Sequence, residues 1–265
     1  MIVTLISDFG YKDNSIAVSK GILMQQSPHI QIVDITHDVQ PFNITQCGYL
    51  LKSSYNFFPK LTVHISLFGV LEYKPAVILL IKIDEQYIIS ADNGLLEFTF
   101  DNHKTQIWKL NNSESYTFTE WLKHCGQLLN QLENLDENWM QANLTQHFTE
   151  RAFSNIQPRL TPEGHLECRV IHIDNYGNII LNIHIDEFEK FRSNRSFTIF
   201  SPKHQSIKKF INNFEKLREG DPFSMVNSAG YIQIGLYQGS AADLFGYSIF
   251  DPKRLIYDKI KIEFN

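Results

Sequence analysis

The sequence lacks the short motifs that identify several large groups of enzymes. None of the patterns G-x-G-x-x-G, G-x-x-x-x-G-K-[ST] and G-x-S-x-G occurs in its 265 residues. These patterns mark dinucleotide-binding turns, phosphate-binding P-loops and the nucleophile turn of serine hydrolases. Their absence leaves those three functions without support from the sequence.

Cysteine is scarce, and histidine lacks the spacing of a metal site. Cys47, Cys125 and Cys168 are far apart and odd in number, and they include no C-x-x-C pair. This usage predicts reduced thiols in a cytoplasmic protein rather than a disulfide framework or a zinc site. The ten histidines are spread along the chain without an H-x₃-H pair. We therefore expect no bound metal.

Long apolar runs and an excess of positive charge are also missing. The longest apolar run, Ala76–Ile81, is far too short to cross a bilayer. Asp8 interrupts the first apolar run, so we expect no secretory leader and a cytoplasmic location. A formal charge of −5 provides no basic footprint for nucleic acid, and 43% apolar with 20% charged residues is typical of a globular protein. We predict neither a membrane nor a nucleic-acid partner.

The first part of the chain alternates between strand and helix patterns. We expect strands at residues 2–6, 30–35, 61–68 and 106–110, helices from about 15, 44 and 120, and a hairpin of 76–83 with 87–90. This order is typical of a doubly wound, mostly parallel sheet between helices. From residue 166 onward, short β-rich runs separated by turns predict a smaller all-β, barrel-like or sandwich domain with little helix. The polar tract at 136–162 separates an α/β domain at 1–160 from the β domain at 161–265.

Polar side chains gather at the predicted ends of strands. They are Asp8, Asp13 and Ser15, then Asp92 and Asn93, then residues 174–178, and finally Asn227 and Ser228. A carboxylate at a strand end can accept both hydroxyls of a ribose, and asparagine can read a base edge or the ends of an amino acid. The pattern therefore favours a small polar ligand such as a nucleoside. The alternative is that Asp8 and Asp13 only cap turns.

Several of these segments resemble one protein family. The matching runs are Ser-Asp-Phe-Gly-x-x-Asp-x-Ser at 7–15, Ile-Val-Asp-Ile-Thr-His-Asp-Val-x-Pro at 32–41, Asp-Asn-Gly-Leu-Leu at 92–96 and Ile-His-Ile-Asp-x-Tyr-Gly-Asn at 171–178. Asn-Ser-x-Gly-Tyr at 227–231 and Gly-Ser-Ala-Ala at 239–242 continue the match. Together they resemble the adenosine-forming S-adenosyl-L-methionine hydrolases, also called SAM hydroxide adenosyltransferases, which are related to the fluorinase and chlorinase.

The resemblance implies a fold, an assembly and a reaction. It implies an α/β domain, a β-barrel-like domain and a homotrimer whose ligand lies between the first domain of one subunit and the second domain of its neighbour. Water or hydroxide would attack the ribose 5′ carbon of S-adenosyl-L-methionine, giving adenosine and methionine without a cofactor. A dry, preorganised pocket favours the attack of an anion on a sulfonium cation.

The resemblance also implies roles for individual residues. Asp8 would hold the ribose hydroxyls. Tyr176 and Asn178 would contact adenine, with Ala241 packed nearby. The methionine part would meet Asp13, Ser15, Asn227 and Ser228, the last two from the neighbouring subunit.

The chain departs from the family where the catalytic residues are expected. The hydrolases carry Val-Asp-Pro-x-Val-Gly-x-x-Arg after the third strand, whereas this chain has Ser66–Lys74 without an Asp and with Tyr73-Lys74 in place of Arg. The family motif Phe-His-Gly-Arg-Asp faces Phe118–Trp121. All three catalytic positions, Asp, Arg and His, are therefore changed.

The substitutes we consider are Glu72, Lys74 and His124. Three hypotheses stay open: a hydrolase with impaired activity, a catalytically inactive protein that binds S-adenosyl-L-methionine or adenosine, and a structural trimer in which Asp8 and its companions only cap turns.

Overall fold

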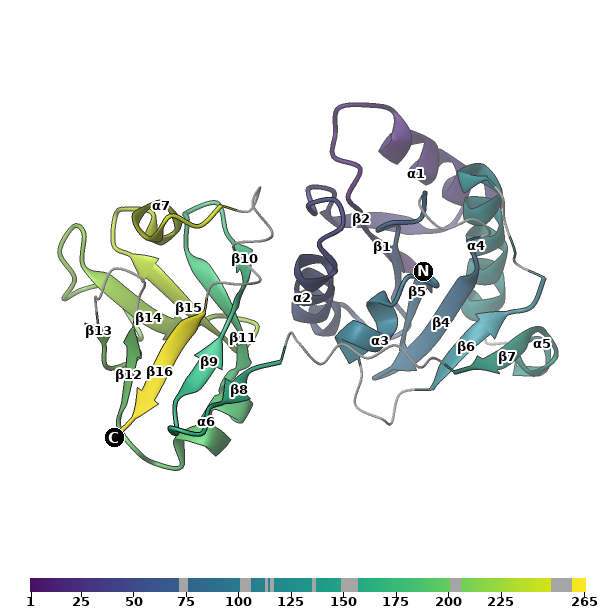
Figure 1. Ribbon diagram of the computed structural model, residues 1–265. Coiled ribbons are helices and arrows are strands. Elements are labelled where there is room, and N and C mark those ends of the chain that lie inside the picture. The colour runs from purple at the N-terminus through teal and green to yellow at the C-terminus, as the bar shows by residue number, and fades with distance from the viewer. Residues whose placement is uncertain are drawn as a thin grey trace. The chain divides into compact units, whose positions relative to one another are not determined.

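The computed structural model describes residues 1–71, 76–100, 106–112, 114, 117–134, 137–148, 157–200, 206–248 and 259–265. The chain divides into two compact units, Met1–Arg151 and Ala152–Asn265 (Figure 1). Unit 1 has two buried apolar cores, and unit 2 has one.

Unit 1 is built on a sheet with the strand order β2-β1-β3-β5-β4-β6-β7. The strands are β1 (Ile2–Ile6), β2 (Gln31–Thr36), β3 (Val63–Ser66), β4 (Ile78–Ile83), β5 (Gln86–Ala91), β6 (Ile107–Leu110) and β7 (Leu144–His147). Strands β2, β1, β3 and β5 are parallel, and β4, β6 and β7 extend the sheet in antiparallel fashion. The predicted hairpin is confirmed as β4 with β5.

Helices cover both faces of this sheet. They are α1 (Ser15–Gln26), α2 (Ile44–Ser54), the 3₁₀ turn η1 (Tyr55–Phe57), α3 (Leu95–Phe100), α4 (Phe118–Glu133) and α5 (Glu137–Asn143). One core joins apolar residues of α1 and α4 to the sheet, and a second core joins residues of α2 and α3 to it. Alternate side chains of the strands point to opposite faces, which is why one sheet serves two cores.

Two glycines allow these helices to approach each other closely. A Cβ at Gly126 of α4 would lie 2.4 Å from Cβ of Gln26 in α1, and a Cβ at Gly48 of α2 would lie 2.6 Å from Oγ1 of Thr99 in α3. Helix α4 starts with a capping box, in which Thr117 and Glu120 each accept a backbone N–H from the other. The sequence thus specifies both where α4 begins and how closely it packs.

Unit 2 consists of two antiparallel sheets around one core. The strands are β8 (Arg159–Leu160), β9 (Leu166–Cys168), β10 (Val170–Ile173), β11 (Ile179–His184), β12 (Phe197–Phe200), β13 (Ser206–Ile207), β14 (Pro222–Val226), β15 (Tyr231–Leu236) and β16 (Ile260–Phe264). The sheet orders are β10-β11-β15-β14 and β13-β12-β16-β9-β8. Apolar residues of both sheets share the core with α6 (Ile185–Arg192) and α7 (Ala241–Phe245).

The sequence pattern missed several elements. Helix α5 and strand β7 lie in the tract at 136–162, which the periodicity left without structure. Helix α6 lies where little helix was expected, because Phe188 is the one buried residue it offers to a hydrophobic pattern. Its helical signal is electrostatic instead. Asp186 and Glu187 occupy its first turn, and Lys190 and Arg192 its last turn, which complements the helix dipole.

Within the described residues, no helix combines the length and the apolar character that crossing a membrane requires.

Candidate functional site

Asp8 lies just beyond the end of β1, where parallel strands of unit 1 meet. The backbone N–H of Gly69, beyond β3, lies 3.4 Å from both carboxylate oxygens of Asp8. Asn93, beyond β5, donates from Nδ2 to the carbonyl of Phe68 at 2.7 Å. Burial raises the pKa of Asp8, and hydrogen bonds to backbone amides counteract this in part. The structure thus brings the segments after β1, β3 and β5 together at the carboxyl-terminal ends of the parallel strands, which is where open α/β sheets bind ligands.

Asp13 precedes α1, and Ser15 is the first residue of that helix. Oδ1 of Asp13 accepts the backbone N–H of Ser15 at 2.8 Å, and this bond lowers the pKa of the exposed Asp13. Asp13 therefore does cap a turn, as the structural alternative anticipated for it. Any contact with a methionine moiety would be additional to that bond.

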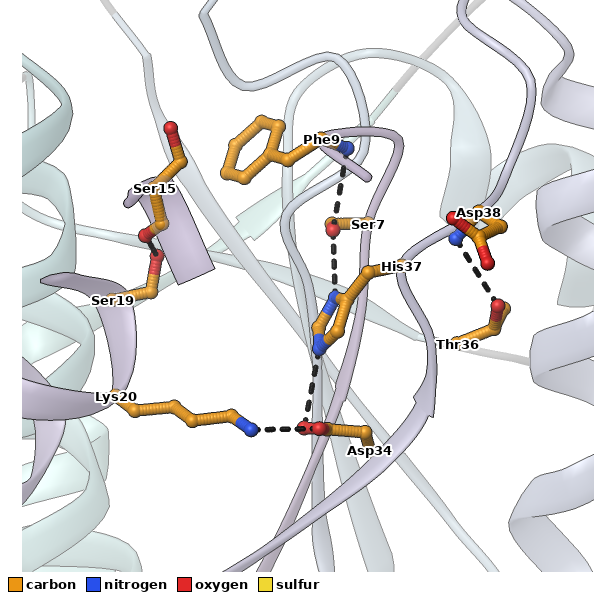
Figure 2. Close-up of polar contacts among 9 residues, drawn as sticks. All are labelled: Ser7, Phe9, Ser15, Ser19, Lys20, Asp34, Thr36, His37 and Asp38. Atoms are coloured by element: carbon orange, nitrogen blue, oxygen red, sulfur yellow. Dashed lines mark hydrogen bonds and ion pairs between the residues drawn. The ribbon is translucent and has the colours of Figure 1, made fainter. Parts of the chain in front are cut away.

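A series of polar contacts links Ser7, the residue before Asp8, to His37, Asp34 and Lys20 (Figure 2). Ser7 Oγ is 2.7 Å from Nδ1 of His37, and Nε2 of His37 is 3.1 Å from Oδ1 of Asp34. Lys20 of α1 donates to the other oxygen of Asp34 at 2.6 Å. Burial lowers the pKa of His37, and the nearby Asp34 offsets part of that effect. In the sequence, Ser7, Asp34 and His37 were noted only as members of the family motifs. Their contacts could not be read there, because Ser7 follows β1 whereas His37 follows β2.

In unit 2, Asp174 shapes the turn that carries Tyr176 and Asn178. Its Oδ1 accepts the backbone N–H groups of both residues at 2.9 Å, and its Oδ2 accepts Nδ2 of Asn178 at 2.9 Å. Gly177 has a φ of +73°, and a Cβ there would lie 2.1 Å from Oγ of Ser240. The N–H of Ala242 donates to the carbonyl of Gly177 at 2.8 Å. The turn and the start of α7, which includes Ala241, therefore lie side by side.

A cavity of about 400 Å³ opens beside this turn. Its walls are Tyr176, Asn178, Phe214, Phe223, Leu236, Tyr237, Gln238, Gly239 and Ser240. The rings of Phe214 and Tyr237 are stacked, with centroids 5.9 Å apart at 19°, while Tyr176 is 81% exposed. A cavity walled by aromatic rings and a fixed amide suits a flat heterocycle.

The aromatic walls of this cavity were missed in the sequence. Phe214 lies between residues 184 and 220, a tract without recognisable motifs, and Phe223 and Tyr237 lie among the short β-rich runs expected after residue 166. The clustering of phenylalanine and tyrosine between 210 and 237 was the available signal, but it does not distinguish a cavity wall from a core.

Asn227 and Ser228 lie elsewhere in unit 2. Oδ1 of Asn227 accepts the N–H groups of Ala229 and Tyr231 at 3.0 Å, which closes the turn between β14 and β15. This turn is at the start of β15, whereas the cavity is at its end, around Leu236. Asn227 and Ser228 are therefore not part of the cavity wall.

The three candidate catalytic residues divide into two groups. Glu72 and Lys74 fall outside the described residues. His124 lies on α4, which begins next to the Asp8 segment because the rings of Phe118 and Phe9 meet edge to face at 5.3 Å. The start of α4 thus lies next to the segment that carries Asp8.

Within the described part of the chain, one group of side chains has the donor set of a cation site. Ligand atoms of Asp92, Glu97 and His147 lie within 4.8 Å of one another, and His147 Nε2 is 3.9 Å from Oδ2 of Asp92. Two carboxylates and an imidazole are ordinary ligands of divalent metals. The absence of a metal, inferred from histidine spacing, stays a prediction.

Fold and site together define a class: two-domain proteins in which an α/β unit with polar strand ends precedes an antiparallel β unit with an aromatic cavity. The chain belongs to the SAM hydroxide adenosyltransferase family. The family's N-terminal domain matches residues 3–127, and its C-terminal domain matches residues 168–254. The resemblance read from the motifs is confirmed.

Individual relatives agree with this assignment. The chain is 26% identical to the (R)-S-adenosyl-L-methionine hydrolase of Methanocaldococcus jannaschii over 97% of this chain and 96% of that protein. It is 22% identical to the fluorinase of Actinopolyspora mzabensis over 91% and 92% of the two chains. A crystal structure of an uncharacterized conserved protein from Thermotoga maritima matches 98% of this chain and 99% of its own with a TM-score of 0.79 and 21% identity. That last likeness concerns the fold.

Proposed function

We propose that the chain is an S-adenosyl-L-methionine hydrolase-like enzyme that releases adenosine and methionine, at a rate reduced by the loss of the family's catalytic residues. The observation that carries this proposal is the cavity of unit 2, which Tyr176 and Asn178, the two residues assigned to adenine by the resemblance, both line. Family membership and relatives named as (R)-S-adenosyl-L-methionine hydrolases support the same reaction. The alternative is an inactive homologue that only binds the nucleoside.

In the proposed complex each end of the ligand has its own residues. Adenine lies in the aromatic cavity against Asn178. The ribose hydroxyls donate to Asp8, whose carboxylate is half-buried at the edge of the sheet. Asp13, Ser15, Asn227 and Ser228 face the methionine moiety. Since Asp8 belongs to unit 1 and the cavity to unit 2, a shared site fits the homotrimer that the family resemblance implies.

The reaction exchanges one bond for another at the ribose 5′ carbon. Water attacks this carbon as the C5′–S bond breaks, the sulfur takes the bonding electron pair, and neutral methionine thioether leaves. The proton of the attacking water passes to solvent or to a nearby base. Orientation of the reactants and exclusion of water supply rate without any catalytic base.

The reduced rate follows from the missing base. General-base catalysis contributes about 10² to 10⁴-fold. The described part of the loop after β3, residues 67–71, contains no Asp, and Glu72, Lys74 and His124 are the candidate replacements.

Restoring the missing groups should raise adenosine release. Phe68 and Val70 are 5% and 3% exposed, so an Asp at either position would bury a charge. Leu71 is 52% exposed and can accept one. We therefore expect Leu71→Asp combined with Lys74→Arg to exceed the wild-type rate.

The proposal also covers the fold and the cellular location of the protein. A doubly wound sheet in unit 1 is supported by helices on both faces, and a barrel-like arrangement in unit 2 by two sheets that share one core. A domain boundary near residue 160 accords with the two compact units. A cytoplasmic location is supported by the free, buried state of the three cysteines.

The test is incubation of the purified full chain with S-adenosyl-L-methionine, followed by chromatography for free adenosine and for bound ligand. Asp8→Ala should weaken adenosine binding about tenfold or more, since a hydrogen bond to a charged group contributes about 1.5–3 kcal/mol. Asp186→Ala, at an 81% exposed side chain on α6, is the control. Unchanged calorimetric affinity in Asp8→Ala would refute the ribose assignment. Bound ligand without adenosine release would favour the binding protein, and a stable monomer in light scattering would exclude the shared site.

A further inference from the structure

The contact of Asp34 with His37, 3.1 Å between Oδ1 and Nε2, determines which ring nitrogen of His37 carries the hydrogen. The Asp34 carboxylate can only accept, so the neighbouring Nε2 of His37 carries the ring hydrogen. Nδ1 is then an acceptor, and Oγ of Ser7 donates to it at 2.7 Å. Ser7 Oγ in turn accepts the backbone N–H of Phe9 at 3.4 Å. Asp34 therefore sets the orientation of every group up to the amide that follows Asp8.

The same residues join two backbone segments. Ser7 N–H donates to the carbonyl of Thr36 at 3.0 Å, and Gly10 N–H donates to the carbonyl of His37 at 2.7 Å. Between the pairs Leu5–Asp34 and Ile6–Thr36 the register of β1 and β2 shifts by one residue. Such a bulge re-aims the side chains that follow it. Asp8 lies inside the segment that these bonds hold.

The burial of Ser7 and His37 limits the roles that these two residues can have. Ser7 and His37 are both 0% exposed, so neither can contact a ligand or act as a nucleophile. We propose that Ser7, His37 and Asp34 are positioning residues that hold the Asp8 carboxylate in place for the ribose hydroxyls. This inference rests on the proposed function, because it concerns the residue assigned there to the ribose.

The positioning should depend on pH. Buried His37 is neutral at neutral pH, the state that accepts from Ser7, since burial lowers its pKa. The charged groups that face it are Asp34, Lys20 and Asp38, and the ring of Tyr11 meets it edge on at 5.3 Å. Protonation would turn Nδ1 into a donor and leave the Ser7 hydroxyl without its acceptor. Because the pKa of His37 is lowered, affinity for adenosine should persist through the pH at which an ordinary imidazole titrates and fall only in more acidic solution.

Two substitutions of His37 separate positioning from packing. His37→Asn keeps an acceptor near the place of Nδ1, and His37→Gln keeps a donor near the place of Nε2 but removes the acceptor for Ser7. His64→Gln is the matched control, because His64 is equally buried and accepts or donates a bond to Thr4 Oγ1 at 2.7 Å in the middle of the sheet. All three variants should lose stability.

Calorimetry with adenosine should show about tenfold weaker binding for His37→Gln, a loss within about threefold for His37→Asn, and wild-type affinity for His64→Gln. The acid loss of affinity should shrink in His37→Asn. The acid-dependent loss of affinity that remains in His37→Asn is due to Asp8, because protonation of its carboxylate also weakens the ribose contact. Equal affinity of His37→Gln and His37→Asn would overturn the proposal, as would an equal loss in His64→Gln.

A readout without ligand distinguishes this inference from the proposed function. The Gly69 amide bonded to Asp8 should exchange its hydrogen faster in His37→Gln than in His37→Asn or the wild type. If the wild type binds neither adenosine nor S-adenosyl-L-methionine, the proposed function fails. Gly69 exchange then decides the positioning role alone, and an unchanged rate in His37→Gln overturns it.

Discussion

Acid should destabilise unit 2 through one half-buried imidazole, that of His172. This residue lies on β10, two positions before Asp174, the carboxylate that shapes the Tyr176–Asn178 turn. Burial lowers the pKa of His172 from 6.5 to about 4, although the negative charge of Asp174 acts in the opposite direction. The unfolded chain therefore takes up a proton near pH 6.5, well before the folded chain does.

The size of the effect follows from that gap. Each pH unit between the two pKa values corresponds to about 1.36 kcal/mol, so the interval from 6.5 to about 4 is equivalent to about 3 kcal/mol. The stabilisation is fully present above pH 6.5. It is lost progressively as the pH falls toward 4, and no more is lost once both states are protonated. A loss of this size is a large fraction of the stability of an ordinary domain.

The assay compares urea unfolding of the wild type, His172→Gln and the control His165→Gln between pH 7 and pH 4.5. All three tryptophans, Trp108, Trp121 and Trp139, belong to unit 1, so their fluorescence follows that unit while far-UV circular dichroism follows both. We expect the stability of unit 2 to depend less steeply on pH in His172→Gln than in the wild type or in His165→Gln. Parallel pH profiles for the wild type and His172→Gln, or an NMR titration of His172 with a pKa near 6.5, would refute the reasoning.

Three further outcomes are expected. Gly235→Ala should weaken adenosine binding and cost about 1–3 kcal/mol of stability, because the new Cβ would lie 2.2 Å from Phe223 Cζ and 2.3 Å from Asn178 Oδ1. Gly21→Ala, with open space around it, is its control, and equal affinity of the two variants would exclude the cavity as the adenine site. The three cysteines are buried and burial raises their pKa values, so a thiol reagent should label none in the native protein and all after denaturation; rapid native labelling would contradict this. Elemental analysis should find no stoichiometric metal, and a bound divalent ion would direct attention to the group at Asp92.

Local patterns in the sequence determined the elements whose signals are short-range. The apolar runs of β1, β2 and β3 and the hairpin of β4 and β5 were readable, because strand periodicity and turn residues act within a few positions. Asp8 was readable as a polar group at a strand end for the same reason. The family could also be recognised from the sequence, because each of its motifs is a contiguous run of residues.

Only the tertiary structure decided which distant residues meet. The cavity is lined by residues from separate segments, among them Tyr176, Phe214, Phe223 and Tyr237. Their spacing along the chain does not indicate that they line the same cavity. The contact of Ser7 with His37 depends on the parallel pairing of β1 with β2 and on the register shift within it. Pairing and register result from the packing of the whole sheet between its two cores, and for that physical reason a reading of local sequence could not supply them.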